Sequence, residues 1–391
     1  MNERILHQDV QDYIDSNLKS DLQKLILKGS SFDDITIQEL ANQIVSKQKC
    51  ERKLPSWFQT KNIYYPPKLN IEQTSSEVTA QYKSEVVSGK NLIDITGGFG
   101  VDAYFFSKKF EAITHCEINQ ELSEISAHNF KQLEATNIQS LSENGIEYLQ
   151  NSKEHFDLIY VDPSRRNDVK GKVFLLKDCE PNIPENINLL FEKTNTILIK
   201  NSPILDITSA INELKFVKEI HIIAVNNDVK ELLFLLEKGH EEDVHIKTIN
   251  FTKKDTQEFD FRYHKKTVST YSQPLEYIYE PNSAILKSGG FHEISNQLNI
   301  FKIHQHSHLY TSEKRIEFPG RIFKILEITS YDKKKITKLL SNKKANITTR
   351  NFPKTVAQIR KELKIKDGGD DFLFFTTNLQ NELICLHCKK V

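Results

Sequence analysis

The sequence has few cysteines, a single tryptophan and no long hydrophobic run. Five cysteines among 391 residues are too sparse for a disulfide framework and fit a reducing compartment. No apolar stretch approaches the roughly 18 residues of a membrane span, and the first ten residues are too polar for a signal peptide. We therefore expect a cytoplasmic protein that has no membrane partner.

Clusters of metal ligands are scarce as well. Cys385 and Cys388 form one C-x-x-C pair, and no second pair follows at zinc spacing. His304, His306 and His308 alternate, so a strand would place all three on one face. An ordinary exposed face explains such a row better than a metal or phosphate site does, and we expect no metal.

Charge is balanced overall but unevenly distributed. The chain carries 53 basic and 53 acidic residues, whereas residues 321–366 hold 14 Lys or Arg and 3 acids, a net charge of 14 − 3 = +11. The rest of the chain therefore carries −11. Such separation favours a basic face for an anionic partner, RNA above all, over lysines that only face solvent.

The stretch with the clearest chemistry lies between residues 91 and 119. A short apolar run at 92–95 predicts a buried parallel strand, and the glycine-rich Gly97-Gly98-Phe99-Gly100 follows it. A helical pattern at 102–109 and a second strand at 112–116 end in Glu117. Strand, glycine turn, helix, strand and acid describe a nucleotide-binding unit, in which the acid accepts hydrogen bonds from ribose hydroxyls. A dinucleotide site and a glycine turn without a ligand are the alternatives.

The spacing Asp94-x-Thr96-Gly97-Gly98-Phe99-Gly100 resembles the first motif of class I S-adenosylmethionine-dependent methyltransferases, and Glu117 resembles the acid of their second motif. The resemblance implies S-adenosyl-L-methionine as cofactor and S-adenosyl-L-homocysteine as product. An acid near the glycine turn can help to bind the cofactor's ammonium group. The predicted cofactor-binding residues are Asp94, Thr96, Gly97, Gly98, Gly100, Glu117, Asn144 and Asp162.

Strand and helix patterns alternate from residue 90 onward, which predicts a Rossmann-like α/β fold with a doubly wound, mostly parallel sheet. The predicted strands are 92–95, 112–116, 138–141, 157–161, 196–200, 219–225 and 244–251, and helical patterns include 121–134 and 207–214. The family resemblance implies seven strands with the site at the carboxyl ends of the first, fourth and fifth. It also implies a tight hairpin between the sixth and seventh strands, but residues 228–238 have a helical pattern and we expect a helix there.

The strongest candidate for the acceptor site is Asp162-Pro163-Ser164-Arg165-Arg166, directly after the strand at 157–161. The fourth motif of amino-methylating family members reads (D/N)-P-P-(Y/F/W), in which the acid and a carbonyl orient an amine. This chain keeps Asp162 and Pro163 but has serine and arginine afterwards. An arginine plane can stack on a base or hold a phosphate. A proline turn whose arginines pair with surface acids is the alternative.

Two further residues have competing interpretations. Cys179 is the nearest candidate for the thiolate that carbon methylation would need, but most such cysteines are simply buried, so a nitrogen or another heteroatom is the better acceptor. Asn144 follows the third predicted strand and can accept a hydrogen bond from the adenine amine, or it can be a turn residue.

The flanking segments complete the predicted organisation. Residues 1–70 have a helical pattern in which Gly29 ends a helix and Thr36 caps the next, with Glu39 closing a capping box. The segments at 277–287, 318–321, 345–353 and 367–370 resemble the tail of bacterial methyltransferases that carry a THUMP-like domain. We predict an N-terminal helical segment at 1–70, a methyltransferase domain at 71–268, a small ferredoxin-like or linker α+β segment at 269–318 and a basic THUMP-like domain at 319–391.

The sequence thus predicts a methyltransferase that modifies a base nitrogen in RNA, either tRNA or rRNA. Asp162, Pro163, Ser164 and Arg165 would form the catalytic site. A small-molecule or protein methyltransferase is one alternative, and a non-catalytic RNA-binding protein that retains the cofactor fold is another. The oligomeric state stays open. The predicted RNA-binding residues are Arg165, Arg166, Lys333, Lys334, Lys335, Lys343 and Lys344.

Overall fold

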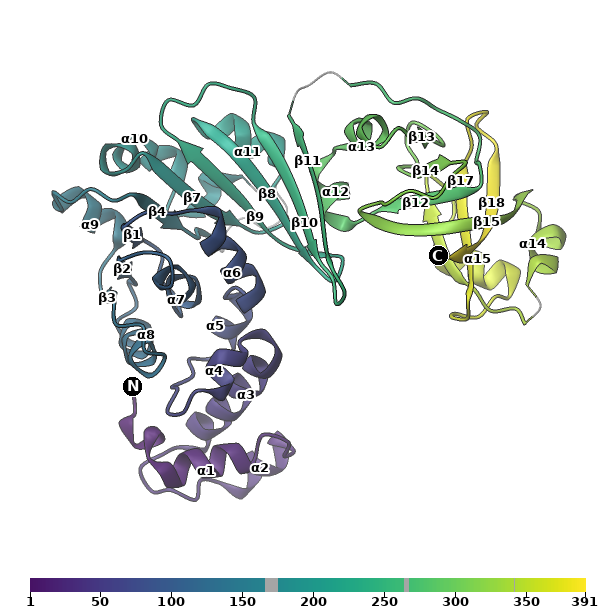
Figure 1. Ribbon diagram of the computed structural model, residues 1–391. Helices are drawn as coiled ribbons and strands as arrows, with labels where there is room; N and C mark the ends of the chain where they lie inside the picture. The colour runs from purple at the N-terminus through teal and green to yellow at the C-terminus, as the bar shows by residue number, and fades with distance from the viewer. Residues whose placement is uncertain (166–174, 264–266, 341) are drawn as a thin grey trace. The chain divides into compact units, whose positions relative to one another are not determined.

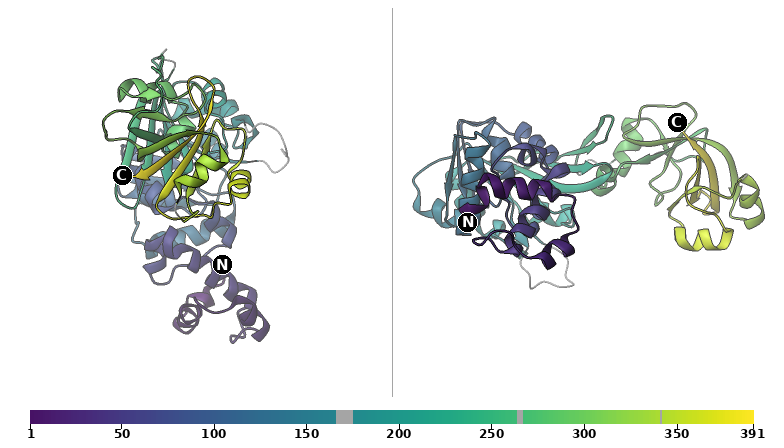
Figure 2. Two further views of the ribbon diagram at one scale, coloured as in Figure 1. Left: turned by 90° about the vertical axis from the view of Figure 1, so that its right-hand side faces the viewer. Right: turned by 90° about the horizontal axis from the view of Figure 1, so that it is seen from below.

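The computed structural model describes residues 1–165, 175–263, 267–340 and 342–391 (Figure 1). The chain divides into two compact units. The first comprises Met1–Lys218 and Leu233–Glu241, and the second comprises Glu219–Leu232 and Glu242–Val391. Figure 2 shows each from two further sides. Among the described residues, no helix combines the length and apolar character that crossing a membrane requires.

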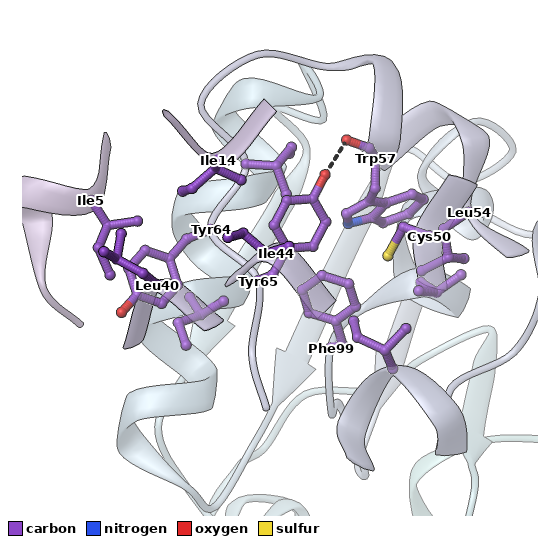
Figure 3. Close-up of a cluster of buried hydrophobic side chains, with 14 of the residues drawn as sticks. Ile5, Ile14, Leu40, Ile44, Cys50, Leu54, Trp57, Tyr64, Tyr65 and Phe99 are labelled. Atoms are coloured by element: carbon purple, nitrogen blue, oxygen red, sulfur yellow. Dashed lines mark hydrogen bonds between the residues drawn. The ribbon is translucent and has the colours of Figure 1, made fainter. Parts of the chain in front are cut away.

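The first unit begins with helices that share one hydrophobic core. They are η1 (Glu3–Leu6), α1 (Gln8–Ser16), α2 (Leu22–Lys28), α3 (Ile37–Lys53), α4 (Pro55–Gln59), α5 (Lys68–Gln73) and α6 (Glu77–Val86). Gly29 ends α2 at φ +80°, and Thr36 with Glu39 forms the predicted capping box of α3. Trp57 and Tyr65 are buried in this core, where the Tyr65 hydroxyl donates a hydrogen bond of 2.9 Å to the Trp57 carbonyl (Figure 3). Both aromatic side chains therefore serve packing.

A nine-stranded sheet follows, in the order β11-β10-β8-β9-β7-β4-β1-β2-β3. Its strands β1 (Asn91–Asp94), β2 (Ala112–Cys116), β3 (Ile138–Leu141), β4 (Leu158–Val161) and β7 (Thr196–Asn201) pair in parallel. The connecting helices are α7 (Val101–Ser107), α8 (Gln120–Gln132), α9 (Gly145–Asn151), α10 (Ile183–Lys193) and α11 (Ile207–Glu213), and the 3₁₀ turn η2 (Leu176–Asp178) precedes α10. The predicted α/β class and the mostly parallel sheet are confirmed. The short strands β5 (Ser164–Arg165) and β6 (Cys179–Glu180) form a separate two-stranded pair.

The predicted helix at 228–238 is wrong. Those residues form β9 (Asp228–Glu237), which follows β8 (Val217–Val225) after only two residues. The two connecting residues, Asn226 and Asn227, have φ of 51° and 63°, and positive φ at both central positions defines the tight hairpin turn that suits twisted strands. Glu231 to Leu236 are all buried, as expected for a strand covered on both faces, so tertiary burial overrides the helix-forming character of Leu, Glu and Lys.

The sheet continues beyond this hairpin. The segment predicted as the last strand is β10 (His245–Phe251), which pairs in parallel with β8, and β11 (Thr256–Arg262) returns antiparallel to β10. Relative to the seven predicted strands, the structure inserts β9 between β7 and β8 and adds β11 at the edge, which makes nine strands.

The second unit contains a seven-stranded sheet in the order β13-β14-β12-β15-β18-β17-β16. Its strands are β12 (Tyr277–Pro281), β13 (Phe301–Lys302), β14 (Tyr310–Ser312), β15 (Gly320–Ser330), β16 (Asn346–Arg350), β17 (Asp371–Thr377) and β18 (Leu383–Lys390), and its helices are α12 (Ser283–Ser288), α13 (Phe291–Gln297), α14 (Lys333–Leu339) and α15 (Val356–Leu363). Strands from before and after residue 320 pair directly, so the last 115 residues form a single sheet rather than two separate ones.

Candidate functional site

The loop between β1 and α7 is shaped by three glycines, two of which leave no room for a Cβ and two of which have positive φ. A Cβ on Gly97 would lie 2.6 Å from the His115 ring, and one on Gly100 would lie 2.3 Å from the Phe130 ring. Gly98 and Gly100 also have φ of +61° and +77°. His115 is fully buried below the loop, and burial lowers its pKa to about 4. The glycines therefore allow the loop to lie flat on the ends of the strands.

The same loop is anchored from the N-terminal helices. Phe99, between Gly98 and Gly100, is 3% exposed, and its ring centroid lies 6.0 Å from that of Trp57. Trp57 also makes an edge-to-face contact of 4.9 Å with Tyr104 in α7. Figure 3 shows Phe99 among the side chains of the helical core. The N-terminal helices thus support the cofactor-loop candidate directly, which composition alone did not predict.

Glu117 is held against the glycine loop by backbone donors. Its Oε2 accepts a hydrogen bond of 2.8 Å from the Gly98 amide, and its Oε1 accepts one of 2.7 Å from the Asn119 amide. Each carboxylate oxygen keeps a second lone pair for a ligand donor. The next residue, Ile118, is 72% exposed and places an apolar face beside the carboxylate. The sequence analysis did not predict a role for it. A ligand that carries a diol next to a flat aromatic ring fits this pair, with the diol on the Glu117 carboxylate and the ring on Ile118.

Asp94 ends β1 and connects with the next strand through Thr96. Its Oδ1 accepts hydrogen bonds from the Thr96 amide at 2.9 Å and the Thr96 hydroxyl at 3.3 Å. The same hydroxyl accepts a bond of 2.7 Å from the Asp162 amide. Burial, reinforced by the nearby Asp102 and Asp162 carboxylates, raises the pKa of Asp94 to about 8. A cation that reached Asp94 would favour its ionised form.

Asn144 serves as the N-cap of α9. Its Oδ1 accepts hydrogen bonds from the amides of Ile146 and Glu147 at 2.9 and 3.4 Å, which is the turn role left open by the sequence. Gly145 follows because a Cβ there would meet Ile95 at 2.5 Å. Capping explains Asn144 in this structure, and its contact with a cofactor amine stays a prediction.

The acceptor-site candidate Asp162 forms an ion pair that the sequence did not reveal. Val161 in β4 is registered with Ile199 in β7, so Asp162 and Lys200 face each other just beyond the paired ends. Lys200 donates to Asp162 Oδ2, and its side chain is 11% exposed, whereas the Asp162 side chain is 36% exposed. The only sequence signal was a lysine that ends a strongly apolar strand.

A second ion pair in this region is more deeply buried than the first. Lys83 of α6 is fully buried, and its Nζ lies 3.2 Å from Asp102 Oδ1. The Tyr160 hydroxyl and the Ser75 hydroxyl donate to Asp102 Oδ2 at 2.6 and 3.0 Å. Burial raises the pKa of Asp102, but Lys83, Lys200 and these two hydrogen bonds together hold it below its usual value. Two lysines and three aspartates therefore meet at the carboxyl ends of β1, β4 and β7, and we call these five residues the charged cluster.

The remaining acceptor-site candidates lie beyond β4. Pro163 is buried, and Ser164 in β5 pairs with Glu180 in β6. Arg165 belongs to β5, but its side chain lies outside what the structure describes, as does Arg166 entirely. Cys179 is fully buried in β6 of the same short strand pair, which does not favour a nucleophile that a substrate must reach.

The basic candidates of the second unit are surface residues. Lys333, Lys334 and Lys335 lie in the first turn of α14 and are exposed, with only Ile336 of that helix buried. Lys343 and Lys344 are exposed in the loop before β16. The structure thus presents all five lysines to solvent and leaves them available to phosphates.

The cysteines and histidines considered as metal ligands do not come together at one site. Cys385 and Cys388 lie in β18, where a spacing of three places them in the cores on opposite faces of the sheet. Burial raises the pKa of both thiols above the usual range. His304 to His308 lie in the turn between β13 and β14 rather than in a strand, and His308 stacks on Phe291 at 3.6 Å. No cluster of three or more metal ligands occurs within the described ranges.

Comparison with known proteins places this chain in a family. A model for a THUMP domain-like family matches residues 320–390, and one for a ferredoxin-like domain matches residues 277–319. A proposed methyltransferase from Porphyromonas gingivalis W83 is 31% identical over 100% of this chain and 98% of its own, with a TM-score of 0.90. The chain belongs to the class I S-adenosylmethionine-dependent methyltransferases that carry a C-terminal THUMP-like domain.

Other solved structures match one part of the chain only. A proposed methyltransferase from Streptococcus mutans, crystallised with S-adenosylhomocysteine, is 14% identical over 41% of this chain and 96% of its own, with a TM-score of 0.31. A tRNA m1G37 methyltransferase from M. jannaschii is 13% identical over 43% of this chain and 51% of its own, also with a TM-score of 0.31. No protein among the curated sequences matches significantly.

Proposed function

We propose that this enzyme transfers the methyl group of S-adenosylmethionine to a base nitrogen in RNA, a tRNA or an rRNA, in the cytoplasm. One observation carries the proposal. The Thr96 hydroxyl bonds both the buried Asp94 carboxylate and the Asp162 amide, so one side chain joins the glycine loop to the acceptor-site candidate. Methyl transfer requires donor and acceptor to be aligned at a fixed separation, and a shared link of this kind supports such alignment.

The residues around the loop fit the cofactor by chemistry. Glu117 has lone pairs for two ribose hydroxyls, and Ile118 offers an apolar face for adenine. Asp94 would accept from the cofactor's ammonium, and the glycines at 97, 98 and 100 leave room for its chain. The sulfonium supplies a methyl group that is already activated, so the protein's task is to orient the two reactants and exclude competing ones.

On the acceptor side, Asp162 and Pro163 would orient the base nitrogen, and Ser164, Arg165 and Arg166 would line its path. The exposed lysines at 333, 334, 335, 343 and 344 would bind phosphates of the same RNA. The +11 charge of residues 321–366 supports this role, because a stretch that folds into strands and helices presents its charges on a fixed surface.

Calorimetry on the full-length protein tests the cofactor assignment. S-adenosylhomocysteine should bind, and NAD should neither bind nor compete. Binding of NAD with no binding of S-adenosylhomocysteine would contradict the assignment.

A gel shift against total small RNA tests the RNA assignment, because each phosphate contact releases counterions and affinity should fall steeply with salt. Changing the five lysines to glutamate should abolish the shift and leave cofactor binding unchanged. A control protein with five exposed first-unit lysines changed to glutamate should still shift RNA; these are Lys19, Lys24, Lys28, Lys61 and Lys109. Equal RNA binding by both variants, or none by the wild type at low salt, would favour a small-molecule or protein acceptor.

A further inference from the structure

Three charged residues of the second unit come together outside the proposed cofactor and acceptor sites. Glu280 in β12 and Arg321 in β15 are cross-strand partners, and Arg321 donates to Glu280 Oε2 through its Nε at 2.7 Å and through its Nη2. Arg350, which ends β16, brings its Nη2 to 2.7 Å from Glu280 Oε1. We call these three residues the arginine triad. Each comes from a different one of the segments by which this tail resembles its family.

The carboxylate of the arginine triad is buried, whereas its guanidinium groups are partly open to solvent. A Cβ on Gly320 would lie 2.2 Å from the Glu280 carbonyl oxygen, so a glycine is needed for β15 to begin this close to β12. The Glu280 side chain is 3% exposed, and those of Arg321 and Arg350 are 39% and 37% exposed. The buried carboxylate therefore fixes both guanidinium groups and leaves part of each accessible to a ligand.

The arginine triad carries more positive than negative charge. Arginine stays protonated in proteins, so two guanidinium groups and one carboxylate leave a net charge of 2 − 1 = +1. Among the residues that the structure describes, neither guanidinium group pairs with another carboxylate. Burial lowers the pKa of the nearby His308 to about 4, and the cations Lys302 and Arg350 contribute to this shift. The surroundings of the arginine triad therefore favour an anion.

Two buried hydrogen-bond donors at this site lack an acceptor. The Nε of Arg350 and the Oγ1 of Thr376 are both buried without a hydrogen-bond partner. Thr376 in β17 is registered with Arg350 in β16, so the two side chains share one face of the sheet. A buried donor without an acceptor is costly, and an anionic ligand supplies acceptors.

A phosphate group fits these features by geometry as well as by charge. The planar guanidinium fork donates parallel hydrogen bonds to phosphate oxygens, and two forks fixed on one carboxylate present such donors from neighbouring strands. RNA carries a phosphate at every nucleotide. The exposed lysines of the same unit would attract the RNA without fixing its position, because each is a flexible point charge.

Building on the proposed function, we propose that Arg321 and Arg350, held by the buried Glu280, bind one phosphate group of the RNA. This phosphate is either an internal phosphodiester or a terminal phosphomonoester. Because the two guanidinium groups are fixed before the ligand arrives, they lose little freedom on binding and set the position of the RNA backbone on the second unit.

Arg350→Gln in the full-length protein tests the site in a gel shift against total small RNA. Affinity should fall by about 10-fold, as expected for a lost hydrogen bond to a charged group. The slope of log affinity against log salt should become less steep by about 0.7–0.9, which corresponds to one phosphate contact. Arg52→Gln removes the same charge from an exposed position in α3 and should change neither quantity.

Treating the RNA with phosphatase distinguishes the two kinds of phosphate. Wild-type affinity should fall to that of Arg350→Gln if the phosphate is terminal, and should stay unchanged if it is an internal phosphodiester. An Arg350→Gln protein that matches Arg52→Gln in both RNA affinity and salt slope would overturn the inference and leave the proposed function standing.

Inorganic phosphate is a second probe and tests the site without RNA. Replacing chloride by phosphate at constant ionic strength should raise the melting temperature of the wild type and of Arg52→Gln more than that of Arg350→Gln, because a ligand stabilises the state that binds it. If Arg350→Gln gains as much from phosphate as the wild type does, Arg350 has only a structural role and the inference is overturned. A wild type that responds to phosphate but binds no RNA at low salt would keep the anion site and overturn the proposed function.

Discussion

The two halves of the site are built in different ways. At β1 and β2, backbone amides and glycines shape the surface, and one carboxylate, Glu117, is held by two amide donors. At β4 and β7, charged side chains form the surface instead, and Asp162 is ion-paired with Lys200. Under the proposed function, the first half would hold the cofactor mainly by shape, and the second would hold the acceptor mainly by charge. Variants in each half should therefore fail in different ways.

The largest effect should follow from removing the support of the first half. Trp57→Ala deletes a fully buried ring that contacts Phe99 of the glycine loop. Loss of such a side chain costs about 3–5 kcal/mol of stability. We expect a markedly lower melting temperature and, in the folded fraction, weaker binding of S-adenosylhomocysteine. Phe58→Ala, on the same helix and only partly buried, serves as the control. A Trp57 variant with native stability and affinity would show that the loop does not depend on the helices.

Removing the carboxylate of the second half should separate binding from transfer. Asp162→Ala should keep its affinity for S-adenosylhomocysteine, because Thr96 bonds the backbone amide of Asp162 rather than its side chain. Transfer should fall by about 100-fold, as expected when a positioning group is lost. Rate measurement and calorimetry on the same preparation check this. Full transfer by the variant would remove Asp162 from the mechanism, and an unfolded variant would assign it a structural role.

Glu117→Ala, in contrast to Asp162→Ala, should weaken the binding of S-adenosylhomocysteine. Loss of hydrogen bonds to a charged group costs about 1.5–3 kcal/mol, which corresponds to a rise in the dissociation constant of roughly 10- to 150-fold. Glu121→Ala, an exposed acid in the first turn of α8, is the matched control. If both variants bind S-adenosylhomocysteine equally well in calorimetry, the ribose does not lie on Glu117.

The smallest effect should be the pH dependence that Asp94 gives to stability and to cofactor affinity. Burial raises its pKa from 3.8 to about 8, so the folded protein holds this proton more tightly than the unfolded chain. Stability from this group is therefore present at low pH and is lost as pH rises from about 4 to 8. Binding of a cationic ligand should release the proton, so affinity should rise by less than tenfold from pH 7 to 8. Asp94→Asn should abolish this dependence, and a wild-type affinity that is flat over this range would contradict it.

The contrast between the halves also explains what could be predicted from the sequence. The glycine loop, its preceding acid and Glu117 lie within 24 residues, so their spacing carries the information. Lys200 lies 38 residues after Asp162, and only the pairing of β4 with β7 brings the two together. The helix expected at 228–238 failed for the same reason, because burial on both faces of β9 depends on strands elsewhere in the sheet. Features encoded by local sequence patterns could be predicted, whereas contacts that depend on strand order could not.

The most direct test of the central claim is transfer of a labelled methyl group. Full-length protein is incubated with methyl-labelled S-adenosylmethionine and total small RNA from a strain that lacks the gene, with Asp162→Ala in parallel, and the RNA is separated on a denaturing gel. We predict that label enters one or a few RNA bands with the wild type and falls by about 100-fold with the variant. RNA that stays unlabelled while S-adenosylhomocysteine binds normally, or label that enters a protein or small molecule instead, would contradict an RNA methyltransferase.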